Sequence, residues 1–284
     1  MKQFIWFLLL GLATLLGLLG VVVLINRYRF RRRLVRECSA LRAAAPSTRP
    51  LPSLAALPEV VERYRRVAVG NRAAVRTLQL SHRGSFTMSP DAKPLPIRGA
   101  QLFTEDPPGF LWWGRIRMSP GVWIDARDMS VAGLGSMRVL LDDTVPIADA
   151  QGPTLDEGAA LRLLAEMPWY PTALFDQRYV RWRGIDDRRA EATLEFAPGR
   201  TVHGVFEFGV EGLPLRMSGE RFTDVGERRP WSGVYRDWRL VEGMRVPFEA
   251  EVSWELPSGP YRYAHWFVAS MRFDAPETPL EASF

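Results

Sequence analysis

The chain has 284 residues, of which 47% are hydrophobic, and a formal net charge of +5. This length admits one large domain or two small ones, and an all-β domain of roughly 200 residues or more is ordinary. The positive charge is confined to the start: residues 1–37 carry +6 and the rest of the chain carries −1. Because the remainder has no excess of positive charge to attract phosphates, the composition argues against a nucleic-acid partner.

An apolar run from Phe4 to Ile25 is long enough to form a membrane-spanning helix. It is almost entirely Leu, Val, Ile, Phe, Gly and Ala, and roughly 20 such residues cross the ~30 Å hydrocarbon core. A cleaved signal peptide would have a shorter apolar region and a small-residue cleavage site, whereas this run ends at Asn26 and a basic cluster. The sequence predicts an uncleaved transmembrane anchor over residues 1–26.

Six arginines between Arg27 and Arg36 follow the apolar run. The positive-inside rule places this flank, and the domain after it, on the cytoplasmic side of a single-pass membrane protein; the periplasmic side is the alternative. The arginines would also lie well against anionic headgroups. Residues 27–53 are expected to form a basic juxtamembrane helix to Ala45 and then a proline-rich linker at Pro46–Pro52.

Residues 54–284 are predicted to form one β-rich domain. A short amphipathic helix is expected at Leu57–Val69, and from Val75 the hydrophobicity alternates with a period of two. Because short turns make neighbouring strands antiparallel, the strands should form a meander, and a dozen strands in one open sheet curl strongly. The expected strands lie near 75–87, 97–104, 109–117, 121–128, 131–142, 178–185, 190–196, 201–208, 213–222, 231–240, 245–255 and 261–273.

Beyond the N-terminal hundred residues, only Thr154–Phe175 is clearly helical in pattern. Thr154 and Glu157 have the spacing of a capping box. Pro168 should end the helix, and Trp169, Tyr170 and Pro171 after it should form a rigid aromatic corner. An amphipathic helix set among strands predicts a plug against the concave side of the sheet. The expected fold is mainly β, a large curled antiparallel sheet or half-barrel with a central helix in or across its concave face, plus one N-terminal transmembrane helix.

The strand expected at 109–117 carries bulky apolar groups on both of its faces. Trp112 points to one side and Trp113 to the other. A strand of this kind is covered on both sides. The helix is one expected cover, and the other face would meet a ligand, a partner or the membrane surface.

Four blocks of the sequence resemble a bacterial family described only as a domain of unknown function. They are PPGFLWWGRI (107–116), RLLAEMPWYPTALF (162–175), VRWRGIDDRRAEATLEF (180–196) and RPWSGVYRDWRLVEGMRVPFEAEVSW (229–254). Members tend to have an N-terminal hydrophobic segment followed by a β-rich domain. The resemblance covers about residues 54–273 and implies an architecture similar to the curled half-barrels of lipoprotein carriers, as an analogy of fold alone. The retained anchor and the basic flank depart from those carriers.

The ten tryptophans are the strongest compositional feature of the chain. Aromatic residues dominate core burial, yet a curled sheet often keeps a cavity lined by them, and apolar pockets are the usual ligand sites. Both a filled core and a core with a ligand cavity are open at this point. The expected ligand-binding residues are Trp112, Trp113, Trp123, Glu166, Trp169, Tyr170, Trp182 and Trp231.

Glu166 is the candidate for chemistry, although no catalytic motif supports it. It lies in the last turn of the expected helix, where the helix dipole disfavours a negative charge. It should therefore either pair with Arg181 or Arg183 or act as an acid or base in an aromatic pocket. The histidines lie in separate expected strands without metal-ligand spacing, so neither a metal nor a cofactor is expected. These histidines are His82, His203 and His265.

The leading hypothesis is a membrane-tethered, non-enzymatic β-rich domain that binds an apolar ligand, a lipid or a lipidated segment, on its concave face. Tethering near the bilayer would raise the effective concentration of a ligand taken from it. One alternative is a scaffold whose interior is filled by its own side chains and whose partner is another membrane protein. Another is a hydrolase that uses Glu166, with a histidine within about 3 Å or across one water.

Overall fold

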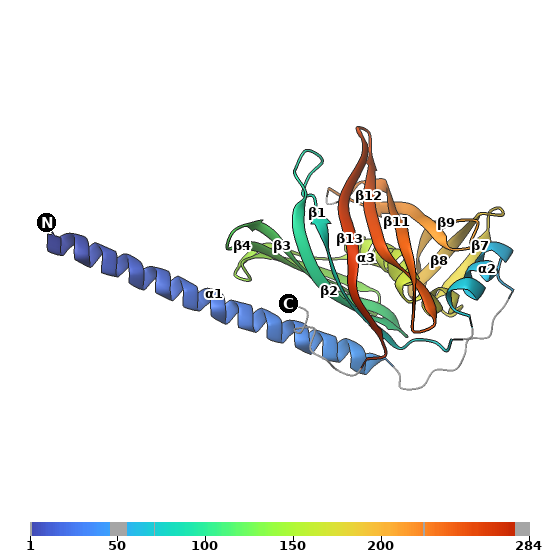
Figure 1. The fold of residues 1–284 in the computed structure, drawn as a ribbon, viewed down its shortest axis with the longest axis horizontal. Coiled ribbons are helices and arrows are strands. Elements are labelled where there is room, and N and C mark those ends of the chain that lie inside the picture. Colours follow the sequence, from blue (N-terminus) through green and yellow to red (C-terminus); the bar gives the residue numbers. More distant parts are fainter. Residues whose placement is uncertain (1, 46–55, 71, 224, 276–284) are drawn as a thin grey trace.

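The computed structural model describes residues 2–45, 56–70, 72–223 and 225–275 (Figure 1). The expected linker Pro46–Pro52 lies outside the described residues. The helices are α1 (Lys2–Ala44), α2 (Glu59–Ala68) and α3 (Pro153–Glu166), and two 3-10 turns follow α3, η1 (Met167–Trp169) and η2 (Pro171–Phe175).

Thirteen strands of the described chain form a single antiparallel sheet. The first six are β1 (Thr77–Phe86), β2 (Leu95–Glu105), β3 (Pro108–Ser119), β4 (Val122–Val131), β5 (Leu134–Leu141) and β6 (Val145–Gln151). The other seven are β7 (Val180–Gly184), β8 (Arg189–Ala197), β9 (Arg200–Phe208), β10 (Pro214–Phe222), β11 (Arg228–Val241), β12 (Met244–Leu256) and β13 (Gly259–Phe273). Their order in the sheet is β6-β5-β4-β3-β2-β1-β13-β12-β11-β10-β9-β8-β7.

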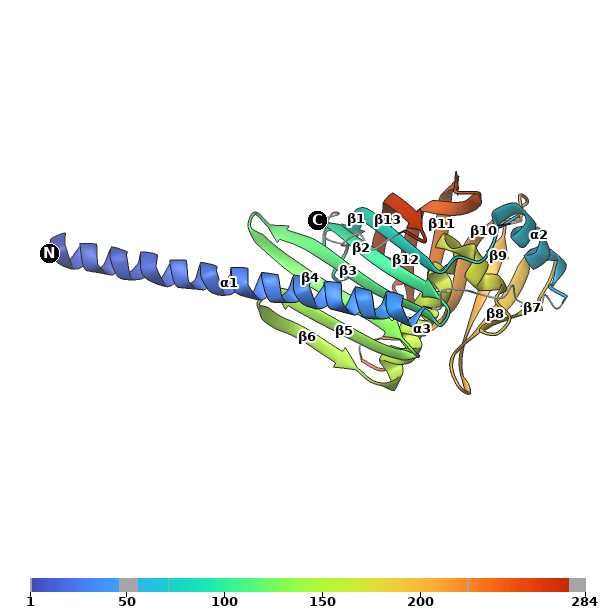
Figure 2. The same cartoon turned by 90° about the horizontal axis from the view of Figure 1, so that it is seen from below.

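Two meanders make up the sheet, joined where β1 pairs with β13. The edge strands β6 and β7 are therefore consecutive in the chain, and α3 with its 3-10 turns connects them. The two meanders, β1–β6 and β7–β13, form the two arms of the curled sheet. α3 contacts β4 and β5 in the first arm and β8, β9 and β10 in the second, so it crosses the concave face (Figures 1 and 2). The expected fold, a curled antiparallel half-barrel with a helix in its hollow, is confirmed.

The start of α3 differs from the expected capping box. The helix begins at Pro153 after Gly152, and its N-cap residue makes no side-chain hydrogen bond. Proline suits the first helical position because its fixed φ is helical and its missing N–H would be unpaired there. Thr154 is exposed, and Glu157 instead forms an ion pair with Arg228 at 2.6 Å. The capping-box prediction is therefore wrong.

Strand β6 was not expected from the sequence. It is a seven-residue edge strand whose side chains are largely exposed, so it lacks the apolar alternation that marks a half-buried strand. Pro146 stands near its start, beside a register shift in the pairing with β5. Proline is tolerated in a sheet at edges and bulges, where its missing N–H breaks no ladder. The proline and the exposure both follow from the edge position.

The main core lies between the concave face, α3 and α2. Its largest fully buried side chains include Tyr64 on α2, Tyr170 in the aromatic corner and Phe103 on β2. The ring centroids of Phe103 and Tyr170 are 4.8 Å apart. α2 contacts β7, β8 and β12 and buries Val60, Val61, Tyr64 and Ala68, which confirms the short amphipathic helix expected at Leu57–Val69.

A second core forms on the convex face, where the C-terminal half of α1 packs against the sheet (Figure 2). The juxtamembrane segment is helical as far as Ala44, as expected, but it also buries one side against β2, β3 and β5. The helix contributes Phe30, Leu34, Cys38 and Leu41, and the sheet contributes Ala100, Leu102, Leu111, Trp113 and Leu140. The second cover of strand β3 is therefore this helix.

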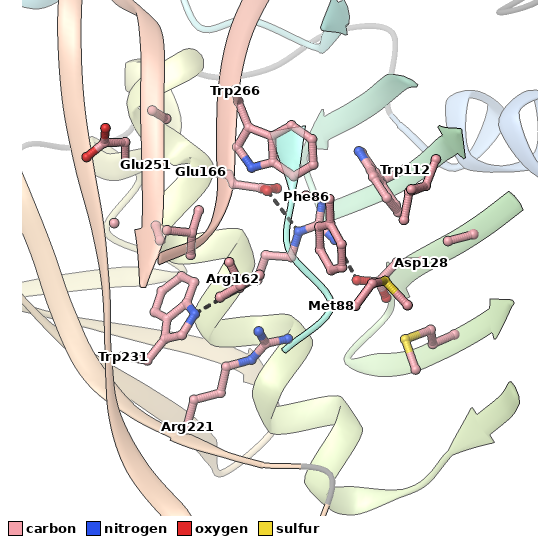
Figure 3. A pocket seen from close by; sticks show the side chains of 18 of the residues that line it. Phe86, Met88, Trp112, Asp128, Arg162, Glu166, Arg221, Trp231, Glu251 and Trp266 are labelled. Carbon is pink, nitrogen blue, oxygen red and sulfur yellow. Dashed lines mark hydrogen bonds and ion pairs between the residues drawn. The ribbon is translucent and has the colours of Figure 1, made fainter. Parts of the chain in front are cut away.

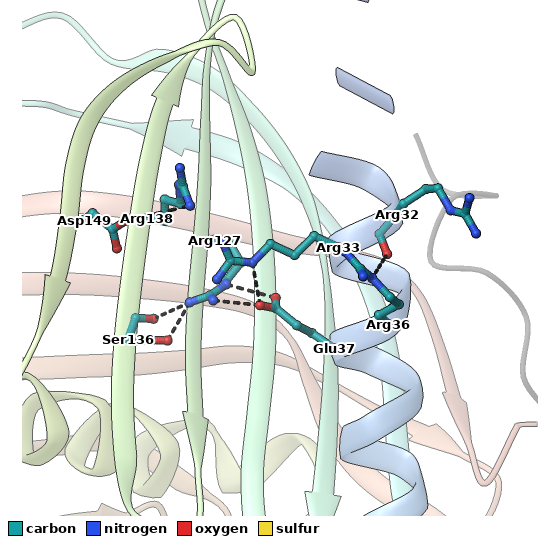
Figure 4. Close-up of polar contacts among 8 residues, drawn as sticks. All are labelled: Arg32, Arg33, Arg36, Glu37, Arg127, Ser136, Arg138 and Asp149. Carbon is teal, nitrogen blue, oxygen red and sulfur yellow. Dashed lines mark hydrogen bonds and ion pairs between the residues drawn. The ribbon is translucent and has the colours of Figure 1, made fainter. Parts of the chain in front are cut away.

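A buried ion pair joins α1 to the sheet beside this second core (Figure 4). The Arg127 guanidinium on β4 donates to both carboxylate oxygens of Glu37, at 3.1 and 2.8 Å, and also to the Ser136 carbonyl at 3.2 Å. Arg33 donates to the same carboxylate at 2.9 Å. The Arg127 side chain is only 5% exposed. Since an unpaired buried charge is costly, the pair strongly favours the docked position of α1.

We expect a chain that begins at residue 54 to be less stable than one that begins at residue 27. The shorter chain lacks the apolar stripe of α1, which is Phe30, Leu34, Cys38 and Leu41. Burying one large apolar side chain contributes about 1.5–3 kcal/mol. The shorter chain also leaves Arg127 without Glu37. The loss in the free energy of unfolding, measured by urea denaturation with tryptophan fluorescence, should be several kcal/mol. Equal stability of the two chains would show that α1 does not dock on the sheet.

Candidate functional site

A cavity of about 400 Å³ lies between α3 and the concave face of the sheet (Figure 3). Its volume falls within the roughly 300–1,000 Å³ that is usual for small-molecule sites. Both arms of the curled sheet contribute to its walls, and α3 contributes Arg162, Ala165 and Glu166. The hollow of the half-barrel is therefore not filled completely by its own side chains.

The lining is dominated by aromatic and aliphatic side chains. One arm contributes residues of β1, β3, β4, β5 and β6, and the other contributes residues of β10 to β13. The first group is Phe86, Trp112, Ile116, Ile124, Ala126, Met137, Val139 and Ile147. The second group, with Trp169 of η1, is Trp231, Tyr235, Ala250, Val252, Tyr263 and Trp266.

The polar ends of these aromatic residues are bonded to the protein. Trp169 Nε1 donates to the Pro247 carbonyl at 3.0 Å, and Tyr235 Oη donates to the Ala165 carbonyl at 2.7 Å. Trp231 Nε1 donates to Tyr263 Oη at 3.0 Å. With these three donors satisfied, the rings of Trp169, Trp231 and Tyr235 present mainly carbon to the cavity.

One charged cluster interrupts this apolar wall. Arg162 donates to Asp128 at 2.6 Å and to Glu166 at 2.8 Å, and its guanidinium carbon lies 4.9 Å and 5.0 Å from the ring centroids of Phe110 and Trp112. A cation between two aromatic rings and two carboxylates is held in one position. The second oxygen of Asp128 has no hydrogen-bond partner among the described residues.

The protonation of Glu166 is set by opposing effects. Burial raises the pKa of Glu166 above its ordinary value, although the charge of Arg162 and the hydrogen bonds from Arg162 and Gln101 act in the other direction. Gln101 Nε2 donates to the second carboxylate oxygen at 2.7 Å. Both oxygens of Glu166 are thus engaged, and its side chain is 14% exposed.

His82 supports the cavity wall from behind. Trp112 Nε1 donates to His82 Nε2 at 2.7 Å, and the Trp266 ring lies 4.7 Å away edge-on. Burial, with a further contribution from the charge of Arg162, lowers the pKa of His82 from 6.5 to about 3. Only a neutral imidazole has a ring nitrogen that can accept the hydrogen bond from Trp112, so His82 acts as a hydrogen-bond acceptor at neutral pH.

Of the eight expected ligand-binding residues, four line the cavity: Trp112, Glu166, Trp169 and Trp231. Trp113 faces the opposite side of the sheet, in the α1 interface. Tyr170 is fully buried and packs against Phe103. The four residues that line the cavity come from β3, β11, the last turn of α3 and η1.

The other two expected residues lie in different surroundings. Trp123 lies among Arg98, Arg115 and Arg117, whose guanidinium carbons are 5.8–5.9 Å from its ring. Trp182 donates to the Leu174 carbonyl at 2.7 Å and packs on Phe206 in the β7–β9 arm. Neither residue is part of the cavity lining.

The prediction that Glu166 pairs with Arg181 or Arg183 is wrong. Arg181 pairs with Glu195 and Arg183 with Glu191, each across neighbouring strands, while Glu166 pairs with Arg162 one turn earlier in α3. Residues i and i+4 of a helix are neighbours on its surface, so their side chains can form an ion pair without any other element. This spacing was visible in the sequence and would have identified Arg162.

The histidines do not meet Glu166 in the described part of the chain. His203 lies within hydrogen-bond distance of Thr193 on the exposed side of β9, and His265 bonds Glu249 at 2.8 Å. The hydrogen bonds of Glu166 come from Arg162 and Gln101, so the Glu166–histidine pair of the hydrolase hypothesis is not present among the described residues.

One group of side chains could approach a metal ion by distance alone. Ligand atoms of Glu249, Glu251 and His265 all lie within 4.8 Å of one another. Arg236 and Arg262 both contact Glu251, at 3.0 and 2.7 Å, so these carboxylates already have positive partners. A network of ion pairs accounts for the cluster.

The fold and cavity define a half-barrel with an apolar interior. Residues 47–266 match a family of unknown function (DUF6544), and the chain belongs to this family, as the four sequence blocks predicted. No curated protein matches the chain.

Solved structures similar to this chain are distant in sequence. A DUF1329 family protein from Desulfovibrio piger is 12% identical, with a TM-score of 0.43, and covers 78% of this chain and 92% of its own. A LolA superfamily protein from Nitrosomonas europaea is 11% identical, with a TM-score of 0.37, and covers 79% and 96%.

We expect His82 to make the fold sensitive to acid. The unfolded chain binds a proton at His82 near pH 6.5 and the folded chain only near pH 3, so this part of the stability is present above pH 6.5 and is lost as the pH falls from 6.5 towards 3. The slope contributed is at most about 1.4 kcal/mol per pH unit.

His82→Gln keeps an acceptor for Trp112 without a titrating group, so urea unfolding between pH 7 and 4 should show a weaker pH dependence than in the unsubstituted chain. His203→Gln, on the exposed side of β9, is the matched control and should change nothing. Identical pH dependence in all three chains would show that folding does not lower the pKa of His82.

Proposed function

We propose that the protein is a membrane-tethered domain that holds an apolar ligand, a lipid or a lipidated segment, in the cavity between α3 and the sheet. The observation that supports this most is a hollow of about 400 Å³ whose aromatic walls have their polar ends bonded elsewhere. Such a surface gains free energy by removing apolar groups from water and offers few polar groups to a polar substrate. Trp112, Trp169 and Trp231 are the proposed contacts.

The ligand we propose has a polar end as well as an apolar body. Arg221 lines the cavity and its guanidinium carbon lies 5.5 Å from the Trp231 ring, and among the described residues no carboxylate pairs with it. Arg162, in contrast, is matched by Asp128 and Glu166. An amphiphile could place an anionic head near Arg221 and its apolar part along the tryptophans.

Two other functions receive less support. A scaffold would have an interior filled by its own side chains, whereas this hollow keeps a cavity. A hydrolase would need an acid–base pair, whereas Glu166 is bonded to Arg162 and Gln101. Binding without catalysis requires neither condition.

We propose that residues 1–26 anchor the chain, that residues 27–53 form the flank and that residues 54–284 form the binding domain. α1 includes a segment long and apolar enough to cross a membrane, a property that anchors and signal sequences share. The packing of Phe30, Leu34 and Leu41 into the second core supports a helix that stays attached, since this helix is part of the folded unit.

Filling the cavity should displace the ligand. Ala126→Phe adds a ring at the lining, and Ala269→Phe adds the same ring at an exposed position on β13. We expect the first variant to lower the affinity for cis-parinaric acid at least about tenfold, which corresponds to about 1.4 kcal/mol, and to lower the amount of co-purifying lipid found by mass spectrometry.

The Ala269→Phe chain should bind as the unsubstituted chain does. Circular dichroism and the melting temperature check that both variants fold. If a folded Ala126→Phe chain binds the probe and lipid unchanged, the cavity is not the binding site.

The orientation in the membrane can be tested with reporters. Because the arginines follow the apolar run, we expect the C-terminal domain on the cytoplasmic side. A C-terminal green fluorescent protein should fluoresce, and a C-terminal alkaline phosphatase should be inactive in the same bacterial host. Active phosphatase with a dark fluorescent protein would place the domain in the periplasm.

A further inference from the structure

Many residues that line the cavity lie beside the turns at one end of the half-barrel, and we infer that the cavity opens at this end, its mouth. Lining residues flank three of these turns: Phe86 precedes the β1–β2 loop, Ile116 and Ile124 flank the β3–β4 turn, and Val139 and Ile147 flank the β5–β6 turn. The β4–β5 turn lies at the other end of β4, a ten-residue strand that spans roughly 30 Å.

α1 runs along the convex face from the mouth end to the far end. At the mouth end, Arg27 bonds Asp143 in the β5–β6 turn at 3.0 Å. At the far end, Arg42 bonds Gln79 near the start of β1 at 2.9 Å. Because Arg27 lies two residues after the apolar run, the apolar part of the helix leaves the domain at the end where the β3–β4 and β5–β6 turns lie (Figures 1 and 2).

Large apolar side chains are exposed around this mouth. Met88, Met118, Val145 and Ile147 are 50%, 41%, 54% and 55% exposed. Met118 and Val145 do not line the cavity, so the cavity does not account for their position. Exposed apolar side chains beside a membrane helix favour insertion at the level of the headgroups.

Basic side chains are also exposed near the mouth. On α1, Arg29, Arg31 and Arg32 are exposed in the first turns after the apolar run, and Arg117 is exposed next to Met118. Arginines at this height would meet anionic lipid headgroups, each with a favourable interaction that falls off within a Debye length. Apolar tips with adjacent cations have the chemistry of a surface that rests on a bilayer.

We propose that the mouth rim, formed by Met88, Met118, Val145 and Ile147, rests on the bilayer that holds α1, so that the cavity opens onto lipid. The fixed docking of α1 sets this orientation, because ion pairs at Arg27 and Glu37 and the apolar stripe between them leave no free hinge within the described helix. Rim docking does not depend on what the cavity holds. The further step, entry of a lipid from the membrane directly into the cavity, rests on the proposed function.

The full chain in vesicles of phosphatidylcholine and phosphatidylglycerol tests the docking. Met118→Cys and Val145→Cys, each labelled with the environment-sensitive fluorophore NBD in a Cys38→Ser background, report on the rim. Leu134→Cys at the start of β5 and Leu240→Cys near the end of β11 are matched controls at the far end, where the two leucines are 64% and 70% exposed.

We expect rim labels to emit at shorter wavelength in vesicles than in detergent and to be quenched several-fold more by doxyl-labelled lipid than the control labels. Equal quenching at all four positions, or rim labels as exposed to aqueous iodide as the controls, would overturn the proposal. Lipid co-purification from the same samples is scored separately, so a loss of docking with lipid still bound, or the reverse, identifies which proposal has failed.

Discussion

The structure depends on α3 occupying the hollow of a sheet that does not close. Its chain connections leave the two edge strands, β6 and β7, to be joined by this helix, so the helix must cross the concave face. A curled sheet whose inner face is apolar needs that cover. The β7–β9 arm, α2 and the aromatic corner fill one part of the hollow. The cavity is the part of the hollow between α3 and the turns at the other end of the sheet, where the side chains of α3 do not fill the space.

The charges placed in this hollow are balanced before any ligand arrives. Arg162 meets two carboxylates and lies between the rings of Phe110 and Trp112. Burying one of these charges alone would cost several kcal/mol, and the cluster avoids this by mutual pairing. The same positive charge helps to keep His82 neutral. Because the cluster satisfies most of its own hydrogen bonds, it fixes α3 against β4 without requiring a polar ligand.

The sequence predicted what short-range periodicity controls. Alternation over Phe110–Arg117 predicted a strand covered on both faces, and the pattern before Pro168 predicted the helix. Long-range contacts were not accessible in this way. The tryptophan content says nothing about which wall each ring faces, so Trp113 and Trp182 were grouped with residues they do not meet. The stripe Phe30, Leu34, Cys38 and Leu41 has helical spacing and could have predicted docking of α1, but the adjacent arginines suggested a basic juxtamembrane helix that lies against lipid headgroups.

Strand β3 contributes to both the concave core and the convex core. Trp112 reaches the cavity from one face, and its neighbour Trp113 packs on α1 from the other, so only the thickness of the sheet separates the cavity wall from α1. A helix attached by a flexible segment would allow the cavity mouth to face in any direction. Here the helix is held by the Arg27–Asp143 and Glu37–Arg127 pairs and by the apolar stripe between them. The direction of the mouth is therefore fixed by the same contacts that stabilise the convex face.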